Sequence, residues 1–415
     1  MSALAREWLL LRRSRTSVFA LLLLAILATA AVCAGWAGVE SQRQQQRKLV
    51  ELQSQETATL ADWIDETGDA GYAAYYTFHP TWNAPGPLAF AALGFRDIAP
   101  QTLRVRALGL EAQMYENEAF NPELALAGRF DFAFVAIYLL PLILIALLHD
   151  LVSRERETGR LPLLAAMSAS LPRVWGMRAL LRGGLAAVVL LLPFWVVAGI
   201  EGAALSDAVA FSAVVLAYLT FWVLLVSGVG LARWTPSVHA AVMVAVWATL
   251  TLALPSAMQS AIARQVPVTQ GVELTLAHRE LVNAAWDQPK EATMAPFLET
   301  HPEWRGTAPV TGRFHWKWYY AFHQVADQRV AAQVRAYREG LMSRQALTER
   351  GGWVLPPVGA QVLMHRLAGT DLPAQLAYED AVRAFHAKLR HFYYPYFFEE
   401  RRFGRENFAS APRFE

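Results

Sequence analysis

The stretch "FAFVAIYLLPLILIALL" (Phe132–Leu148) contains no charged residue, and "DLVSRERETGRLPLL" (Asp150–Leu164) follows it almost directly with five charges between Arg154 and Arg160. An apolar run of about 17–20 residues can cross the hydrocarbon core of a bilayer as a helix. A simple stop signal needs only a few Lys or Arg, whereas these charges alternate in sign and precede a glycine and a proline. The two stretches therefore predict a membrane span that ends in a structured, charged connection.

The composition of the whole chain agrees with a membrane protein. Of the 415 residues, 55% are hydrophobic and only 17% are charged. We predict an all-α membrane protein with five transmembrane helices, in which two insertions, 39–130 and 259–415, form a mainly helical extracytoplasmic domain. The first apolar segment could be a cleaved signal peptide, but it is longer than a typical signal core, which favours an uncleaved anchor. The predicted spans are residues 17–38, 131–149, 180–200, 208–231 and 238–258.

Basic residues predict the orientation of the spans, because Lys and Arg in short connections favour the cytoplasmic side. The connection Glu201–Asp207 has acids and no base, so it is expected outside. The N terminus and the segment 150–179 are expected to be cytoplasmic. In residues 1–16, one apolar helical face suits a helix in the cytoplasmic interface, although a plain basic flank is the alternative. The arginines concerned are Arg6, Arg12, Arg13, Arg15, Arg154, Arg156, Arg160, Arg173, Arg178, Arg182 and Arg233.

The first insertion begins with residues 40–66, which lack Pro and Gly and should continue the first span as a polar helix. Gly68 and Gly71 are expected to end that helix. Residues 79–100 are rich in Pro and Gly and are predicted to form loops without a strand ladder.

The clearest helix of the second insertion follows "GTD" (Gly369–Asp371). Thr370 or Asp371 can cap it, and Pro373 suits its first turn. An apolar stripe and an i, i+4 ion pair support the prediction: Val382, Phe385, Leu389 and Phe392, with Glu379–Arg383.

Several classes of function find no support in the residues. The net charge of +2 favours no nucleic acid partner, and the single cysteine, Cys33, excludes an intrachain disulfide. No phosphate-binding loop, zinc-protease motif or nucleophile elbow occurs, so we expect no enzyme and no cofactor bound by this chain. Glu155 and Glu157 are two residues apart and cannot share a helical face, which argues against paired acid–base catalysis.

Three histidines in a tryptophan-rich stretch raise the question of a metal site. Their spacing matches no familiar metal-binding motif, so structural roles are favoured and no metal is expected. The residues are His301, His315 and His323, with Trp304, Trp316 and Trp318 nearby.

Gly159 and Pro162 should break the helix after the charges and let "LPLLAAM" (Leu161–Met167) run along the membrane surface. Glu155 and Glu157 are expected to be solvated. A charged connection braced by an apolar element suits contact with a soluble protein, whereas the alternative is a merely solvated flank.

Two segments carry a resemblance to a known family. The order of an apolar span, Asp150, "ERE" (155–157), Gly159, Leu161 and Pro162 resembles the cytoplasmic coupling segment of ABC-transporter permeases of the type-2 exporter class. The family usually has Gly-Thr-Leu where this chain has Gly-Arg-Leu at 159–161. "LAGTDLPAQLAYEDAVRAFHAKLRHFYYP" (Leu367–Pro395) is similar to the signature of a permease subfamily with a large extracytoplasmic loop after the fifth transmembrane helix. The signature residues are Gly369, Thr370, Asp371, Glu379, Asp380, Phe385 and His386.

The resemblance implies a permease subunit of the bacterial inner membrane that lacks its own ATPase. Its partners would be a cytoplasmic nucleotide-binding subunit, which holds ATP and Mg, and a second permease, identical or different, within membrane lipids. A periplasmic partner is a further option. The family normally has a sixth span, for which the residues after Gln259 offer no apolar run. The expected contacts with the ATPase are Asp150, Arg154, Glu155, Arg156, Glu157, Gly159, Arg160, Leu161 and Pro162.

Two functions fit this expectation. In the first, ATP hydrolysis on the partner drives export of a substrate, and the nearly uncharged spans favour an amphiphilic one. In the second, the ATPase cycle moves the periplasmic domain and acts on an extracytoplasmic partner without solute transport. The residues do not identify the substrate.

Overall fold

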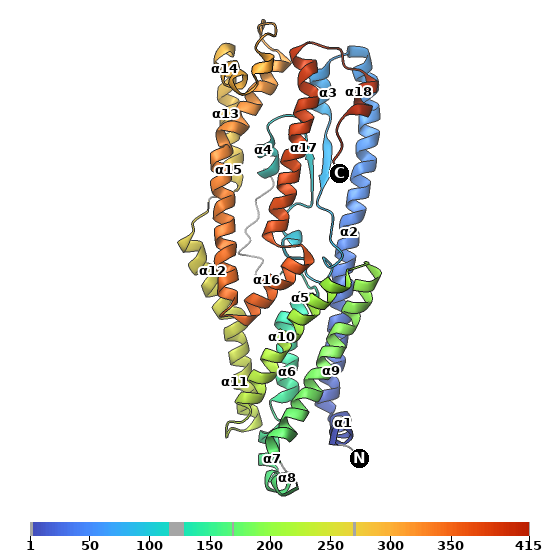
Figure 1. Ribbon diagram of the computed structural model, residues 1–415, viewed down its shortest axis with the longest axis vertical. Coiled ribbons are helices and arrows are strands. Elements are labelled where there is room, and N and C mark those ends of the chain that lie inside the picture. Colours follow the sequence, from blue (N-terminus) through green and yellow to red (C-terminus); the bar gives the residue numbers. More distant parts are fainter. Residues whose placement is uncertain (1–2, 116–127, 168–169, 269–270, 415) are drawn as a thin grey trace.

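The computed structural model describes residues 3–115, 128–167, 170–268 and 271–414 (Figure 1). Within these residues helices dominate and form an elongated molecule, and five of them are long and apolar enough to cross a membrane. The predicted all-α membrane fold is confirmed. The candidate spans lie within Arg15–Thr67, Phe132–Glu157, Leu171–Ile200, Leu205–Val229 and Pro236–Gln265.

A single helix, α2 (Arg15–Thr67), contains the first span and the predicted polar continuation. At ~1.5 Å per residue its length is about 80 Å, so it runs well beyond any bilayer. Gly68 ends the helix with a φ of 69°, a left-handed conformation that favours glycine. The prediction that Gly71 also stops the helix is wrong. Gly71 lies inside the next helix, α3 (Ala70–Tyr76), where the Trp316 ring leaves no room for a β-carbon.

The remaining spans and the short helices between them follow in chain order. A short helix, α1, precedes α2, and two short helices, α7 and α8, connect the second and third spans. The second and fifth spans each contain a π-helical segment, η3 and η4. The bounds are α1 (Ala3–Arg13), α5 (Phe132–Phe134), η3 (Val135–Leu139), α6 (Leu140–Leu148), α7 (Ser153–Glu157), α8 (Leu161–Met167), α9 (Leu171–Ile200), α10 (Leu205–Val229), α11 (Pro236–Ala248), η4 (Thr249–Ala253) and α12 (Leu254–Gln265).

A proline accounts for the π-helical segment η3, and two side chains bond the carbonyl groups that it leaves without their usual partners. Pro141 lacks an N–H group and cannot donate to the Ile137 carbonyl one turn earlier. The Tyr218 hydroxyl donates to that carbonyl at 2.9 Å, and Trp247 Nε1 donates to the Tyr138 carbonyl at 3.1 Å. An unsatisfied carbonyl in lipid costs several kcal/mol, so these two side chains allow an irregular helix inside the span bundle.

The core of the span bundle includes a piece of the first insertion. Helices α2, α6, α9 and α10 pack together, and the stretch Leu88–Leu93 is buried among them although its sequence reads as part of a loop. The Phe90 ring lies 5.9 Å from the Phe194 ring, centre to centre. The Phe90 carbonyl approaches α2 so closely that a β-carbon at Gly35 would collide with it.

The part of the molecule remote from α7 and α8, here called the distal part, contains the remaining elements. It is mainly helical, but the prediction of no strand ladder is wrong. Two four-residue strands pair antiparallel, with His79 opposite Val105 and Trp82 opposite Thr102. The bounds are β1 (His79–Trp82), η1 (Gly94–Asp97), β2 (Thr102–Val105), α4 (Leu110–Tyr115), α13 (Gly271–Trp286), α14 (Lys290–Thr300), η5 (Pro302–Trp304), α15 (Trp316–Gly352), α16 (Pro356–Ala368), α17 (Leu372–Phe398) and α18 (Arg405–Ser410).

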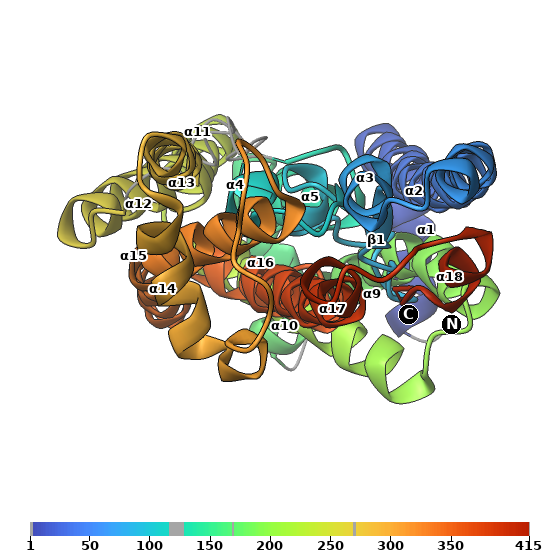
Figure 2. The same cartoon turned by 90° about the horizontal axis from the view of Figure 1, so that it is seen from above.

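Tertiary packing explains why the sequence pattern does not indicate the two strands. Four-residue strands are too short to show clearly the alternation of apolar and polar residues that indicates longer strands. The pair is held from outside by α17, because the Tyr378 hydroxyl lies 2.8 Å from Thr81 Oγ1. Seen from above, α13, α14 and α15 lie on one side of α17, and α2, α3 and α18 lie on the other (Figure 2). Helix α17 thus occupies the middle of a second, aromatic-rich core.

Gly35 and Gly38 provide a matched test of the contact between α2 and the buried loop. Gly35→Ala should lower stability by roughly 1–3 kcal/mol, because the added methyl group meets the Phe90 carbonyl. At Gly38 the methyl group would make an ordinary contact with Leu93, so Gly38→Ala should be neutral or slightly stabilising. Apparent melting temperatures in detergent measure both effects. Equal melting of the two variants would contradict the packing described here.

Candidate functional site

The charged connection between the second and third spans, residues 150–167, is here called the knuckle. It lies at the end of the spans farthest from the distal part (Figure 1). Helix α7 ends after Glu157, and Gly159 reverses the chain with a φ of 69°. The Arg160 N–H donates to the Glu155 carbonyl at 2.9 Å and closes the turn. Helix α8 then begins, with Pro162 in its first turn. The expected helix break is therefore confirmed, and its physical cause is a left-handed glycine followed by a proline.

Ion pairs fix the base of the knuckle to neighbouring helices. The Arg178 guanidinium on α9 is nearly buried and lies 3.0 Å from Glu155 and 2.9 Å from Glu7 of α1. Arg182, one turn further along α9, donates to the Leu147 carbonyl, and its guanidinium lies 3.6 Å from the Asp150 carboxylate. The expectation that Glu155 is solvated is wrong, because α9 starts early enough to bring its arginines against α7.

The other side of the knuckle is exposed. Arg154 keeps two thirds of its side chain in solvent, at 67%, although it also reaches Asp150 at 3.3 Å. Helix α8 has no buried residue, and its Leu163 and Met167 are 62% and 73% exposed. Arg156 is the exception, since it donates to the Ala232 carbonyl in the connection between α10 and α11 at 3.0 Å. Of the other predicted contact residues, Leu161 is half-buried, and the exposed ones are Glu157, Gly159, Arg160 and Pro162.

The segment Gly369–Asp371 joins the distal part to the span bundle. Gly369 ends α16 with a φ of 64°, and the Asp371 carboxylate caps α17 by accepting from the Ala374 N–H at 3.1 Å. Thr370 is not the cap. Its hydroxyl donates to the Ala92 carbonyl at 2.7 Å, and its own carbonyl accepts from the Phe95 N–H at 2.8 Å.

Asp131 holds the same loop from the other side and was not singled out in the sequence. One carboxylate oxygen accepts from the Leu93 N–H and the other from the Phe134 N–H, both at 2.8 Å. The Ala133 N–H donates to the Ala91 carbonyl at 2.8 Å. An acid directly before an apolar run is the N-cap pattern, which could have indicated the bond to Phe134 but not the bond to Leu93. Together Asp131 and Thr370 clamp the loop 88–95 between the second span and α17.

The signature acids of α17 belong to a polar network within the distal part. Arg383 lies 3.7 Å from Glu379 and 3.3 Å from Asp380, and it forms a bidentate pair with Glu111 of α4 at 2.9 and 3.0 Å. Asp380 also pairs with Arg338 of α15 at 2.5 and 2.7 Å. These contacts hold α4 and α15 against α17. The remaining signature residues are buried: Phe385 lies in the aromatic core, and His386 Nε2 is 2.9 Å from the Arg106 carbonyl.

Asp327 is the centre of this network. Its carboxylate accepts from the Leu110 and Glu111 N–H groups at 2.9 and 3.1 Å and from Arg390 at 2.6 Å, and His278 Nε2 lies 3.0 Å away. Burial opposes its charge, but Arg390 and His278 outweigh burial and hold the pKa of the Asp327 carboxyl well below its usual range. Asp327, which was not among the predicted residues, thus ties α4, α13 and α17 to its own helix α15.

The three histidines considered as metal ligands are separated and serve different contacts. His301 stacks on Phe297 with ring centres 4.3 Å apart, and His315 accepts from the Lys317 N–H at the start of α15. His323 accepts from the Gly109 N–H at 3.3 Å. In the part of the chain that the structure describes, no three His, Cys, Asp or Glu side chains gather as metal ligands would.

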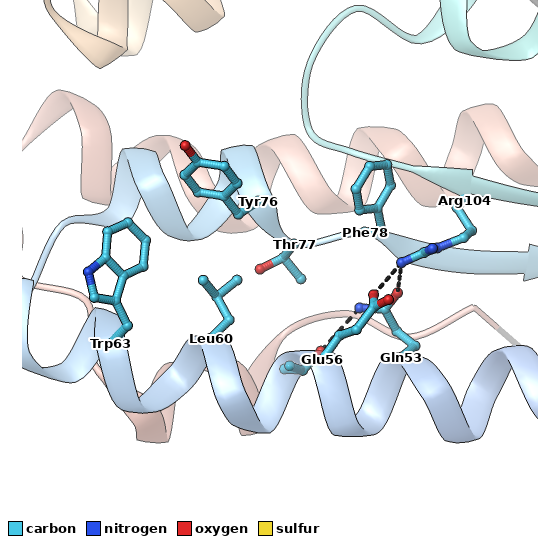
Figure 3. A pocket seen from close by; sticks show the side chains of 9 residues that line it. Gln53, Glu56, Leu60, Trp63, Tyr76, Thr77, Phe78 and Arg104 are labelled. Carbon is cyan, nitrogen blue, oxygen red and sulfur yellow. Dashed lines mark hydrogen bonds and ion pairs between the residues drawn. The ribbon is translucent and has the colours of Figure 1, made fainter.

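A groove of about 460 Å³ opens between α2 and the segment leading into β1 (Figure 3). One end is aromatic and apolar, with Leu60, Trp63 and Tyr76. The other end is polar: Arg104 donates to Gln53 at 3.3 Å and pairs with Glu56. The Arg104 guanidinium also lies 4.6 Å from the centre of the Phe78 ring. The shape and chemistry fit an amphiphilic ligand or a protein segment.

One comparison with known proteins gives a match, and it lies in the C-terminal part of the chain. The model of one family, a domain of unknown function called DUF3526, matches residues 271–415, which include α13 to α18 and the signature segment. No match was found among curated proteins or among solved structures. The fold and this match define a helical membrane protein whose C-terminal distal portion is similar to DUF3526.

Buried histidines make the distal part sensitive to acid. Burial lowers the pKa of His79 to about 4 and those of His323 and His386 to about 3. The unfolded chain takes up protons below about pH 6.5 whereas the folded chain does not, so stability is full above that pH and falls as the pH drops towards the folded pKa values. Each histidine should cost up to about 1.4 kcal/mol per pH unit in that window.

Apparent melting temperatures between about pH 7.5 and about pH 5, a range that includes the upper part of the window, test this expectation. His79→Gln should make the decline with falling pH shallower. His391→Gln, at an exposed position of α17, is the control and should leave the pH profile unchanged. A profile that is flat for the unchanged protein would refute the role of the buried histidines.

Proposed function

We propose that this protein is the membrane-spanning permease subunit of an ATP-binding-cassette transporter in a bacterial inner membrane. It couples a separate cytoplasmic ATPase, which binds ATP and Mg, to export of an amphiphilic substrate. The observation that carries the proposal is the α7–α8 knuckle, which is tied by ion pairs at its base while its other face presents charges and the uncovered apolar side chains of α8. Such a face suits a protein partner, because exposed Leu and Met gain from being covered.

Ion pairs and one continuous helix would carry movement of the knuckle to the distal part. Glu155 and Asp150 connect the knuckle to α9. At the other end of α9, Glu201 accepts from Arg43 at 3.1 and 2.5 Å and from Trp36 Nε1 at 2.7 Å, both on α2. Helix α2 continues without interruption into the distal part. Movement of the knuckle would therefore be transmitted to the distal part through α9 and α2.

The spans favour an amphiphilic cargo and a second permease. Their central turns carry no Asp, Glu, Lys or Arg, and an isolated charge there would be expensive. Exposed apolar side chains line α9 to α11, including Leu192, Leu224 and Val244. Lipid or a second permease subunit would cover these faces, and a route for an amphiphile could form between two permeases.

Mechanical coupling is the second candidate, and a specific feature favours it. The unbroken helix α2 borders the groove between Gln53 and Trp63, so movement of this helix relative to β1 would change the groove directly. In that case the ATPase cycle would alter binding of an extracytoplasmic partner at the groove, without solute transport.

Substitutions on the exposed face of the knuckle test the contact with the ATPase. Glu157→Ala and Leu163→Asp should leave the melting temperature unchanged, because neither side chain is buried. Loss of one charge-assisted contact is worth roughly 1–3 kcal/mol, so Glu157→Ala should weaken assembly with the ATPase about 5- to 150-fold. Co-purification from native membranes and the ATPase activity of the isolated complex provide the measurements.

Two controls separate contact from folding. Glu273→Ala, at an exposed position of α13, should change neither assembly nor activity. Glu155→Ala removes one partner of nearly buried Arg178 and should instead lower the melting temperature, by roughly 1–3 kcal/mol in free energy. Full assembly and activity of both Glu157→Ala and Leu163→Asp would count against the coupling role.

A comparison of the assembled complex in lipid, with and without a trapped ATP analogue, distinguishes export from mechanical coupling. Export predicts a cavity between the two permeases that opens to one side of the membrane and admits an amphiphile. Sealed spans in both states, together with a shift of α2 against β1 at the groove, would overturn the export proposal and support mechanical coupling.

A further inference from the structure

The turn between α15 and α16, "GGWVLPP" (Gly351–Pro357), exposes two apolar side chains almost completely. Trp353 is 92% exposed and Val354 is 80% exposed, the largest values among the bulky hydrophobic side chains of the described residues. A single exposed apolar residue is ordinary, but a tryptophan and a valine side by side at the tip of a turn indicate a surface that is covered in the working protein.

The turn is firmly built and presents these side chains in a fixed way. The Leu355 N–H and the Val354 N–H both donate to the Gly351 carbonyl, at 2.9 and 3.0 Å. Helices α15 and α16 cross so closely that a β-carbon at Gly352 would lie 2.8 Å from the Gly359 Cα. The two glycines therefore hold the helices in contact directly behind Trp353.

The position of the turn along the spans identifies what covers it. Gly351 packs against Met258 so tightly that a β-carbon would collide with its sulfur. Met258 lies 22 residues after Pro236, the first residue of the fifth span, or about 33 Å along the helix at ~1.5 Å per residue. That distance is close to the ~30 Å thickness of a hydrocarbon core. The turn thus lies at the membrane boundary on the distal side.

The neighbouring contacts agree with this depth. Helix α16 packs against α10, η3 and η4, all of which belong to candidate spans, and its Met364 is buried in the core of the span bundle. In Figure 1 the corner between α15 and α16 lies beside the junction of α11 and α12. Two exposed arginines are close along the chain: Arg350 directly precedes the turn, and Arg264 follows Met258 on α12. Tryptophan is enriched at both interfaces of a membrane, where its amphipathic ring lies at the level of the headgroups.

We propose that the α15–α16 turn inserts into the lipid leaflet on the distal side, where Trp353 and Val354 lie at the boundary between headgroups and acyl chains and Arg350 and Arg264 face lipid phosphates. The occupant of this surface is phospholipid. The turn anchors the end of the long helix α15 to the membrane, so the distal part is held by lipid as well as by the spans. The inference rests on the membrane-spanning fold and is independent of the ATPase.

Site-directed spin labelling in vesicles of phosphatidylethanolamine and phosphatidylglycerol tests the proposal with the full-length protein. In a Cys33→Ser background, a nitroxide is attached after Trp353→Cys, and its collision rates with oxygen and with a water-soluble nickel chelate are compared. Leu276→Cys is the matched control, because Leu276 is an apolar residue 58% exposed on α13 of the distal part. Val354→Cys provides a second position in the turn should the tryptophan substitution impair folding.

Insertion predicts an oxygen-to-nickel collision ratio several-fold higher in the turn than at position 276, because oxygen concentrates in lipid and the chelate stays in water. The same ratio at both positions would show that the turn faces water and would overturn the proposal. Protection of the turn from both reagents would show that protein, such as a second copy of the chain, covers it, and would overturn the proposal as well.

Discussion

The need to satisfy backbone hydrogen bonds inside a membrane governs this structure. Helical hydrogen bonds meet most of that need, and two of the exceptions receive help from side chains. Pro141 disturbs the second span, and Tyr218 and Trp247 bond the carbonyls that the π-helical segment presents. The loop 88–95 enters the span core without a regular helix, and Asp131 and Thr370 bond its backbone groups. Each exception lies where two parts of the chain are joined.

That loop explains how the distal part is attached to the spans. Its aromatic side chain at Phe90 packs with Phe194, its backbone presses on α2 at Gly35, and its end is bonded to the start of α17 through Thr370. The segment Gly369–Asp371 is therefore a connector, and the DUF3526 match at residues 271–415 includes it together with the C-terminal helices of the aromatic core. A movement of α17 relative to the second span would have to break or shift these bonds.

The inward and outward faces of the knuckle differ in a way that bears on the proposed coupling. Its inward charges, Asp150 and Glu155, form ion pairs with Arg182 and Arg178. Its outward charges and α8 are exposed. In the proposed coupling, the anchored charges would transmit force and the uncovered ones would receive it. The same arrangement recurs at the opposite end of α9, where Glu201 is held by Arg43 and Trp36. Helix α9 is thus fastened to its neighbours at both ends.

The sequence by itself determined the helical membrane fold, the polar continuation of α2, the break at Gly159 and the start of α17 with a cap at Thr370 or Asp371. These features depend on local properties: apolar length, a glycine with positive φ, and a carboxylate one turn from free N–H groups. Tertiary structure alone decided that Glu155 is paired, that Gly71 makes room for Trp316, that two short strands form, and that Asp131 and Asp327 bond distant segments. Those outcomes depend on which residues far apart in the chain meet in space, and no local pattern of charge or hydrophobicity carries that information.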